Sequence, residues 1–373
     1  MFKSRFLLMF SLLLAIGLIL GACGSSEEGG EAGGDTNEKE EKEQTSGEGN
    51  GDFSVAMVTD VGGVDDKSFN QSAWEGLQAF GEEHGLSKGE GFDYAQSESD
   101  ADYTTNINRL VRQDYNLIFG IGYLLQPAIE EVAAQYPDTK FSVVDSVAKG
   151  DNVASVTFKE HQGSFLAGVA AAKKTKTNKI GFVGGVDGDL INKFEAGYVA
   201  GAKSVNPDID VDVQYAESFA AADKGKLIAS NMYSKGIDVI YHASGATGNG
   251  VFAQAKDLKK NNPDEDYWVI GVDRDQYEEG AIEDTNVTLT SMVKRVDIAV
   301  QDVANQAKQG EFPGGKVLEY GLDDDAISIA RTNEEALNEE IIAAVEDWKE
   351  KIVNGDVEVP SNRDDLKTYV DSL

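Results

Sequence analysis

Short runs of apolar and β-branched residues alternate with amphipathic helical patterns, and this alternation restricts the fold more than any other feature of the sequence. In a first set we expect strands at residues 54–60, 92–97, 117–122, 141–145 and 153–158. Helical patterns lie between them at residues 69–83, 103–112 and 127–135. Strands that alternate with helices pair in parallel through right-handed crossovers, so this set predicts a doubly wound parallel sheet.

A second set of the same kind follows without a Pro-rich linker. Its expected strands lie at residues 179–183, 211–216, 239–243 and 268–273. Its helical patterns lie at residues 161–174, 190–204, 223–234 and 250–260. The sequence therefore predicts an α/β protein with two similar lobes joined by a hinge, and residues 150–159 are the expected first crossing. A chain of 373 residues is long enough for two full cores.

The last part of the chain departs from this regular order. Strands are expected at residues 287–293, 317–320 and 327–329, and helices at residues 295–309 and 334–353. The final helix carries an apolar stripe that we interpret as facing a core, made of Leu337, Ile341, Val345, Trp348 and Ile352. We expect the chain to re-enter the first lobe after about residue 290 and then to leave it. The predicted division gives residues 52–158 with about 291–312 to lobe one, and residues 159–290 with about 313–373 to lobe two.

The N-terminus has the pattern of a targeting segment. Lys3 and Arg5 precede an apolar run at residues 6–20, and the letters LGAC end at Cys23. This arrangement resembles the signal of bacterial lipoproteins, and the run is shorter than the about 20 residues that a spanning helix needs. We therefore expect residues 1–22 to be a signal peptide that is removed, and Cys23 to carry a lipid anchor with palmitate.

The composition limits the kinds of partner and cofactor that we expect for this protein. Residues 23–51 are rich in Gly, Glu, Ser and Lys without apolar periodicity, so we expect a disordered tether. The chain has 66 acidic and 33 basic residues and no basic run, which argues against nucleic acid as a partner. One cysteine and three scattered histidines form no metal motif, and we expect no metal, no cofactor and a monomer.

The stretch DVGGVDDKSFNQSAWEG at residues 60–76 is the most informative local motif. It joins an apolar strand pattern to a helix pattern. Ser68 and Gln71 have the spacing of a capping box, which makes Ser68 the expected N-cap and lets Phe69 and Asn70 open the helix. Phe69 beside polar residues at a strand end is either a stacking surface for a ligand or an ordinary core residue, and the pattern alone leaves both open.

Several expected strands end in a polar residue or a glycine: Asp60, Gly122, Asp145, Gly245 and Asp273. If the carboxyl ends of both sheets face one cleft, these residues converge there. Paired carboxylates also occur at residues 65–66 and 323–325, but neighbours in sequence do not give the geometry of a hydrolase.

The motif at residues 60–76 resembles the opening signature of the basic membrane protein family, the solute-binding lipoproteins of ABC importers that include purine nucleoside receptors. Further segments are similar in the expected order, over about residues 52–330: IxGIGYLLQPA, KFSVVDS, KFEAGYVAGAK, AESFAAADKGK, IYHASGATGNGVF, VIGVDRDQ and TSMVKRVDIAV. The resemblance implies a type I periplasmic-binding-protein fold, a permease partner, and guanosine, inosine or adenosine as ligand.

The resemblance also implies roles for single residues. Phe69 and a second ring would sandwich the purine, and we favour Phe219 over Phe194 as that ring. Asp273 and Lys294 would bind the ribose hydroxyls. The remaining implied ligand contacts are Asp60, Asn70 and Asp145 at polar edges, Gly245 through its backbone, and Ser68.

We expect a binding protein and not an enzyme, but other functions stay open at this point. A receptor of the same fold for sugars is one alternative, since aromatic rings with carboxylates also suit pyranoses. An extracellular enzyme that cleaves nucleosides is another, and a surface protein for adhesion or signalling is a third.

Overall fold

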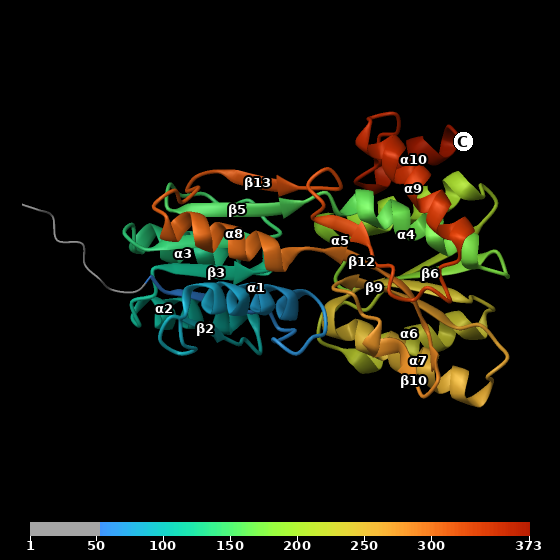
Figure 1. Ribbon diagram of the computed structural model, residues 1–373, viewed down its shortest axis with the longest axis horizontal. Coiled ribbons are helices and arrows are strands. Elements are labelled where there is room, and N and C mark those ends of the chain that lie inside the picture. The colour runs from blue at the N-terminus through green and yellow to red at the C-terminus, as the bar shows by residue number, and fades with distance from the viewer. Residues whose placement is uncertain (1–52) are drawn as a thin grey trace, which may run out of the picture. The chain divides into compact units, whose positions relative to one another are not determined.

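Two six-stranded sheets, each covered by helices, form the fold of residues 53–373, which are the part of the chain that the computed structural model describes (Figure 1). The expected signal peptide, Cys23 and the tether lie outside the described residues. None of the helices in residues 53–373 is long and apolar enough to cross a membrane.

The first sheet is parallel throughout, with the strand order β2-β1-β3-β4-β5-β13. Its strands are β1 (Val55–Val58), β2 (Phe92–Ala95), β3 (Leu117–Ile121), β4 (Lys140–Val144), β5 (Val153–Phe158) and β13 (Val317–Tyr320). The helices on it are α1 (Phe69–His84), α2 (Tyr103–Val111), α3 (Gln126–Gln135) and α8 (Val296–Lys308). We call this sheet with its helices the first lobe.

The second sheet has the order β7-β6-β8-β9-β12-β14, and only β14 runs antiparallel to its neighbour. Its strands are β6 (Lys179–Gly184), β7 (Asp210–Tyr215), β8 (Val239–Ala243), β9 (Trp268–Asp273), β12 (Thr288–Lys294) and β14 (Ile327–Ile329). Its helices are α4 (Glu160–Lys174), α5 (Asp189–Val205), α6 (Ala222–Ser234), α7 (Gly248–Asn261), α9 (Glu339–Val353) and α10 (Arg363–Asp371). A two-stranded hairpin, β10 (Ala281–Ile282) and β11 (Thr285–Asn286), follows β9. This sheet with its helices is the second lobe.

Helix α1 shows how the sequence sets the packing around the site. Its buried stripe of Ala73, Leu77 and Phe80 belongs to the same core as Met57 of β1. Beside it lies α8, and a Cβ atom on Gly76 would come within 2.3 Å of the backbone oxygen of Asp297 (Figure 1). Only glycine allows two backbones to approach so closely, so Gly76 fixes how α1 sits against α8.

The α/β class with two largely parallel sheets is confirmed, and the expected strands appear within a few residues of their predicted ends. The chain passes between the sheets three times, after β5, after β12 and after β13. The expected division put residues 313–373 in the second lobe, whereas β13 pairs with β5 and extends the first sheet. A four-residue strand carries no signal in its sequence for which of two sheets it will join.

The C-terminal part differs from the prediction in two further respects. Helix α9 begins at Glu339 and not near residue 334, because the Asn338 side chain accepts the Ile341 N–H at 2.9 Å and caps it there. The short helix α10 is not anticipated. The interpretation of Trp348 as a packing residue is confirmed, since its ring centroid lies 5.2 Å from that of Phe165.

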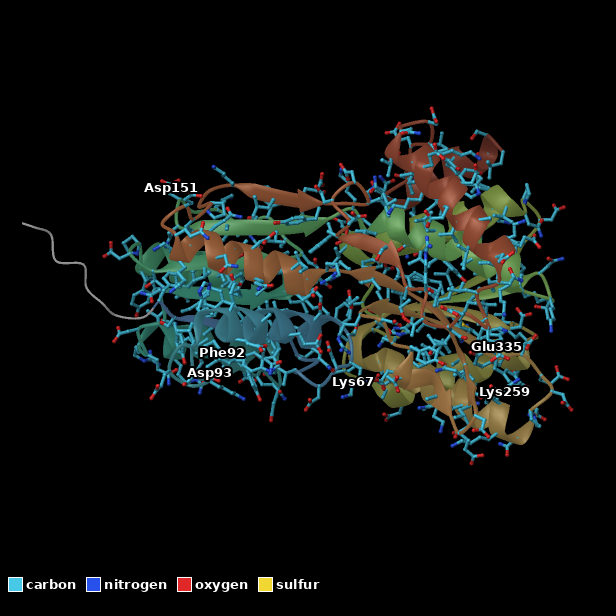
Figure 2. The ribbon with its side chains drawn as sticks, viewed as in Figure 1. Lys67, Phe92, Asp93, Asp151, Lys259 and Glu335 are labelled. Carbon is cyan, nitrogen blue, oxygen red and sulfur yellow. The ribbon has the colours of Figure 1, made fainter. Side chains whose placement is uncertain are left out.

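The two lobes meet at the N-terminal end of α1. Lys67 lies at this junction, whereas Asp151 lies at the far end of the first lobe and Lys259 on the outer side of the second (Figure 2). The strands of both sheets end toward the junction, which places the loops that follow them around a common cleft (Figure 1).

Candidate functional site

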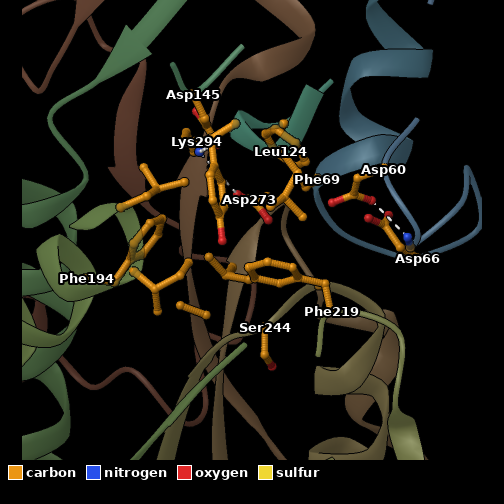
Figure 3. A pocket seen from close by; sticks show the side chains of 18 residues that line it. Asp60, Asp66, Phe69, Leu124, Asp145, Phe194, Phe219, Ser244, Asp273 and Lys294 are labelled. Carbon is orange, nitrogen blue, oxygen red and sulfur yellow. Dashed lines mark hydrogen bonds and ion pairs between the residues drawn. The ribbon is translucent and has the colours of Figure 1, made fainter. Parts of the chain in front are cut away.

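A pocket between the two sheets is lined largely by residues at or just beyond the carboxyl ends of the parallel strands (Figure 3). The space in it that no atom occupies, counted together with the part that is open to solvent, is about 550 Å³. The strand-end residues whose convergence the sequence predicts all line it: Asp60, Gly122, Asp145, Gly245 and Asp273. The carboxyl ends of strands in open α/β sheets are where such folds bind ligands, so this pocket is the candidate site.

Most of the expected ligand-binding residues line this pocket, namely Asp60, Phe69, Asp145, Phe194, Phe219, Gly245, Asp273 and Lys294. Ser68 and Asn70 do not line it. Their side chains bond to pocket carboxylates from behind, Ser68 to Asp273 and Asn70 to Asp60.

The capping box expected between Ser68 and Gln71 is wrong. Ser68 holds the N-cap position, but its hydroxyl donates to the Asp273 carboxylate at 2.5 Å. The Asp66 carboxylate caps the helix instead. It accepts from the backbone N–H groups of Ser68, Asn70 and Gln71 at 2.9–3.1 Å. A carboxylate has more acceptor sites than a hydroxyl and complements the positive end of the helix, so Asp66 outcompetes Ser68 for these amides.

Asp60 is held rigidly at the wall of the pocket. Its Oδ1 accepts from the Asn70 side-chain amide at 2.7 Å and from the Gly62 N–H at 2.8 Å. Burial raises the pKa of Asp60 to about 6, although both hydrogen bonds oppose the rise. Asn70 also donates to Asp66 at 3.0 Å, so its amide group is fully engaged in orienting carboxylates.

Lys294 lies at the centre of a cluster of buried acids. Its Nζ is 2.6 Å from Asp145, 3.6 Å from Glu160 and 4.0 Å from Asp273, and no member of the cluster is more than 9% exposed. Burial opposes a charge on Lys294, but the three carboxylates outweigh burial and raise its pKa. Burial raises the pKa of Asp145, and it raises the pKa of Asp273 to about 7.

Asp145 and Asp273 share an unusual backbone. Their φ angles are +67° and +66°, in the left-handed region that non-glycine residues seldom adopt. Asp tolerates this region better than most residues, and here it turns each carboxylate from the strand end toward the pocket. One oxygen of Asp145, Oδ1, is buried without a hydrogen-bond partner among the described residues, which leaves an acceptor for a ligand.

Aromatic rings form the other walls. The rings of Phe69 and Phe194 lie 4.9 Å and 5.5 Å from Lys294 Nζ, within the range of cation–π contacts. Phe219 extends from a second-lobe loop toward the middle of the pocket (Figure 3). Its ring meets that of Tyr123, from the first lobe, edge-on at 6.3 Å. The pocket therefore combines flat apolar faces with buried acids and one cation.

Sequence reasoning missed Glu160 and Tyr123. Glu160 lies two residues beyond the end of β5, and its side chain is fully buried between Lys294 and Lys193. A carboxylate in the first turn of a helix is normally explained by its favourable interaction with the helix dipole. Nothing in the sequence pattern therefore marks Glu160 as buried. Tyr123 directly follows the predicted Gly122, and the strand-end rule would have found it.

The raised pKa of Asp273 predicts how stability depends on pH. A carboxylate whose pKa is about 7 when folded and about 4 when unfolded contributes stability that is complete below pH 4 and lost as the pH rises through 7. Asp273→Asn removes this loss. The difference in free energy of unfolding, variant minus wild type, should therefore rise by roughly 1–3 kcal/mol as the pH goes from 5 to 8.

Urea denaturation at several pH values measures this difference. Asp138→Asn, a change of the same kind at an exposed turn, should run parallel to wild type. A constant offset between Asp273→Asn and wild type across this range would contradict a pKa of about 7 for Asp273.

No group of three or more His, Cys, Asp or Glu side chains within residues 53–373 is arranged to hold a metal ion. The buried acids are instead joined by hydrogen bonds and by the Lys294 ion pairs. The arrangement suits a ligand that offers hydroxyl or N–H donors and a flat face, because the acids accept hydrogen bonds and the rings stack.

Solved structures and curated relatives resemble this chain over most of its length. A crystal structure of a solute-binding protein of an ABC transporter from Aeropyrum pernix superposes with a TM-score of 0.72 at 26% identity, over 85% of this chain and 96% of that chain. A relative from Listeria monocytogenes, named CD4+ T-cell-stimulating antigen, is 55% identical over 96% of this chain and 99% of its own. A relative from Lactococcus lactis, named ABC transporter nucleoside-binding protein BmpA, is 46% identical over the same shares.

Two α/β lobes with a pocket between their strand ends define a solute-binding protein of the type I periplasmic fold. Residues 53–363 match the family model described as ABC transporter substrate-binding protein, PnrA-like. The chain belongs to this family, the Bmp family of ABC transporter substrate-binding proteins.

Proposed function

We propose that this protein is a lipid-anchored receptor that binds a purine nucleoside between its lobes and delivers it to an ABC permease. The observation that carries the proposal is the pocket itself, in which aromatic rings from both lobes surround buried acids and one buried lysine. The name of the relative from Lactococcus lactis, a nucleoside-binding protein, supports the same ligand class.

The two ends of the pocket suit the two parts of a nucleoside. Phe69 and Phe219 offer ring faces for the base, and Asp60 offers a fixed carboxyl group to the polar edge of the base. Asp273 accepts hydrogen bonds from vicinal hydroxyls and Lys294 donates to them, which suits the ribose. A ligand without these hydroxyls leaves buried polar groups unpaired and is rejected for that reason.

Phe219 remains our choice for the second stacking ring. It extends from a loop into the pocket and already contacts a ring of the opposite lobe, Tyr123. Phe194 belongs to α5, is 3% exposed and lies against Lys294, so it suits a wall beside the sugar. Asn70 orients Asp60 in this account and does not contact the ligand.

Phe69 should contribute through its ring face and not only through its volume. Phe69→Ala is expected to weaken nucleoside binding by about 1–3 kcal/mol, the usual worth of one stacked base. Phe69→Leu keeps most of the apolar volume and should lose nearly as much, whereas Phe69→Tyr should bind within about threefold of wild type. Equal affinities of the Leu variant and wild type, measured by calorimetry, would exclude stacking on this ring.

Attachment to the membrane rests on Cys23 in this proposal. Cys23→Ser should release the protein from the cell surface into the medium, where immunoblotting of the two fractions detects it. Retention of the variant on the membrane would exclude a lipid anchor at this residue.

The ligand class is tested by mass spectrometry of the small molecule that denaturation releases from the purified protein. We expect a purine nucleoside, and recovery of hexoses alone would favour the sugar receptor. Incubation with inosine or guanosine, followed by chromatography of the base, tests the enzyme. Steady release of free base would contradict a receptor that only binds.

A further inference from the structure

We propose that Asn249, Arg274 and Gln276 of the second lobe are positioning residues that hold the loop carrying Phe69, and that they form an interlobe latch which stabilises the closed cleft. The latch consists of these residues and Asp273 on one side, and of residues 66–68 and Glu75 on the other. Its effect on nucleoside affinity rests on the function proposed above, but its effect on closure does not.

Gln276 is the central contact of the latch. Its side chain is 1% exposed, and its Oε1 accepts the Val272 N–H at 2.9 Å and lies 3.0 Å from His242 Nε2. Its Nε2 donates to the backbone oxygen of Lys67, in the first lobe, at 2.9 Å. Because two N–H donors face Oε1 and a carbonyl oxygen faces Nε2, the Gln276 amide can take only one of its two flipped orientations.

His242, the last residue but one of β8, supports this orientation of Gln276. Burial lowers the pKa of His242 to about 4, so the ring is neutral at pH 7. Its Nε2 therefore carries the hydrogen that Gln276 Oε1 accepts, and its Nδ1 is left to face the Ser244 hydroxyl at 3.4 Å. The second lobe thus aims one amide N–H at the first lobe.

The neighbours of Lys67 are bonded in the same way. The backbone oxygen of Asp66 accepts from the Asn249 side chain at 3.2 Å, and the Ser68 hydroxyl donates to Asp273. Three consecutive residues, 66 to 68, are therefore each bonded to the second lobe. Lys67 itself has a φ of +64°, in the left-handed region that non-glycine residues seldom adopt.

A charged pair adds a second contact between the lobes, farther along α1. Arg274 Nε lies 3.0 Å from one oxygen of Glu75, and Arg274 Nη2 lies 2.7 Å from the other. This bidentate pair is geometrically specific, and it joins α1 to the residue that directly follows Asp273. The bonds from the second lobe to residues 66–68 and to Glu75 all cross the cleft. Opening the lobes therefore breaks them together and frees the loop that positions Phe69.

Such bonds raise affinity without touching the ligand. If only the closed form binds ligand, the apparent affinity is reduced in proportion to the fraction of the protein that is closed. A bond made only in the closed form raises this fraction and therefore tightens binding. We expect loss of the latch to shift the ligand-free protein toward open forms and to speed ligand dissociation.

Gln276→Glu tests the latch selectively at pH 8. The carboxylate that this change introduces still accepts from Val272 and His242, but it has no donor for the Lys67 oxygen and repels it. We expect about 5- to 10-fold weaker guanosine binding, mainly through faster dissociation, the order of one lost hydrogen bond. Gln135→Glu, the same change at an exposed position of α3, should behave as wild type.

Closure itself is measured without ligand. Spin labels at Glu98→Cys and Asp223→Cys, exposed positions after β2 and at the start of α6, report the distance between the lobes. Gln276→Glu should shift the distance distribution to longer values, even if the protein binds no nucleoside at all. Such a result would overturn the proposed ligand but uphold the latch.

The Glu75 and Arg274 pair provides a second, independent test. Glu75→Gln and Arg274→Gln should each lengthen the distance, and the double variant should add little, because either single change already removes the pair. Unchanged distances and affinities in Gln276→Glu and in both single variants would overturn the latch.

Discussion

Lys294→Met should lower the free energy of unfolding by about 3–5 kcal/mol at pH 8, the cost of leaving buried charges without their partner. Lys294 is the central cation for Asp145, Glu160 and Asp273, and each of these is buried. Met fills a similar volume without the charge. The expected loss therefore measures the electrostatic contribution of the cluster more than its packing.

The pH dependence of this loss follows from the same cluster. Without the cation, the pKa values of Asp145 and Asp273 rise further above those of the unfolded chain. Acids with raised pKa values keep their contribution to stability at low pH, where they are protonated, and lose it as the pH rises. The loss in Lys294→Met should therefore be smaller at pH 5 than at pH 8.

Lys193→Met is the matched control for this prediction. Lys193 pairs with Glu160 at 3.2 Å, but its side chain is 30% exposed. The Lys193 ammonium is partly in water and Glu160 keeps Lys294 as a partner, so this variant should lose clearly less stability than Lys294→Met. Equal losses in the two variants, or a loss in Lys294→Met that is independent of pH, would contradict the account of the cluster.

Asp273→Ala should cause the largest loss of ligand affinity, about 2–5 kcal/mol. The change removes the acceptor for the ribose hydroxyls and leaves Lys294 with one carboxylate fewer. It also removes the bond from Ser68 that crosses the cleft. Calorimetric titration with guanosine measures the sum of these effects.

Two further variants separate the parts of that sum. Ser68→Ala removes only the bond across the cleft and should cost about 0.5–1.5 kcal/mol. Asp273→Asn keeps the shape and one acceptor oxygen, and it should fall between Ser68→Ala and Asp273→Ala. If Ser68→Ala cost as much as Asp273→Ala, Asp273 would act in closure alone and not on the ligand.

The architecture could be predicted from sequence because its signals are local. Apolar runs, helix periodicity and polar residues at strand ends each occupy a few neighbouring positions. The parallel sheet rule then brings Asp60, Asp145 and Asp273 together without knowledge of any distance. Lys294 entered through the family resemblance, since a lysine after a strand is by itself an ordinary surface residue.

What the sequence could not predict depends on contacts between distant segments. Ser68 has the spacing of a cap, but Asp66 captures the helix amides and Ser68 bonds to the other lobe. Glu160 is buried only because Lys294, far along the chain, reaches it. The position of Gln276 against Lys67 depends on how the lobes close, and no periodic pattern encodes that.

The most direct measurement is calorimetric titration of the purified protein with guanosine, inosine, adenosine and a set of hexoses. We expect one-to-one binding of at least one purine nucleoside, with a Kd of about 1 μM or tighter, or at least 8 kcal/mol of binding free energy. Saturable binding of a hexose together with no heat from any purine nucleoside would contradict it.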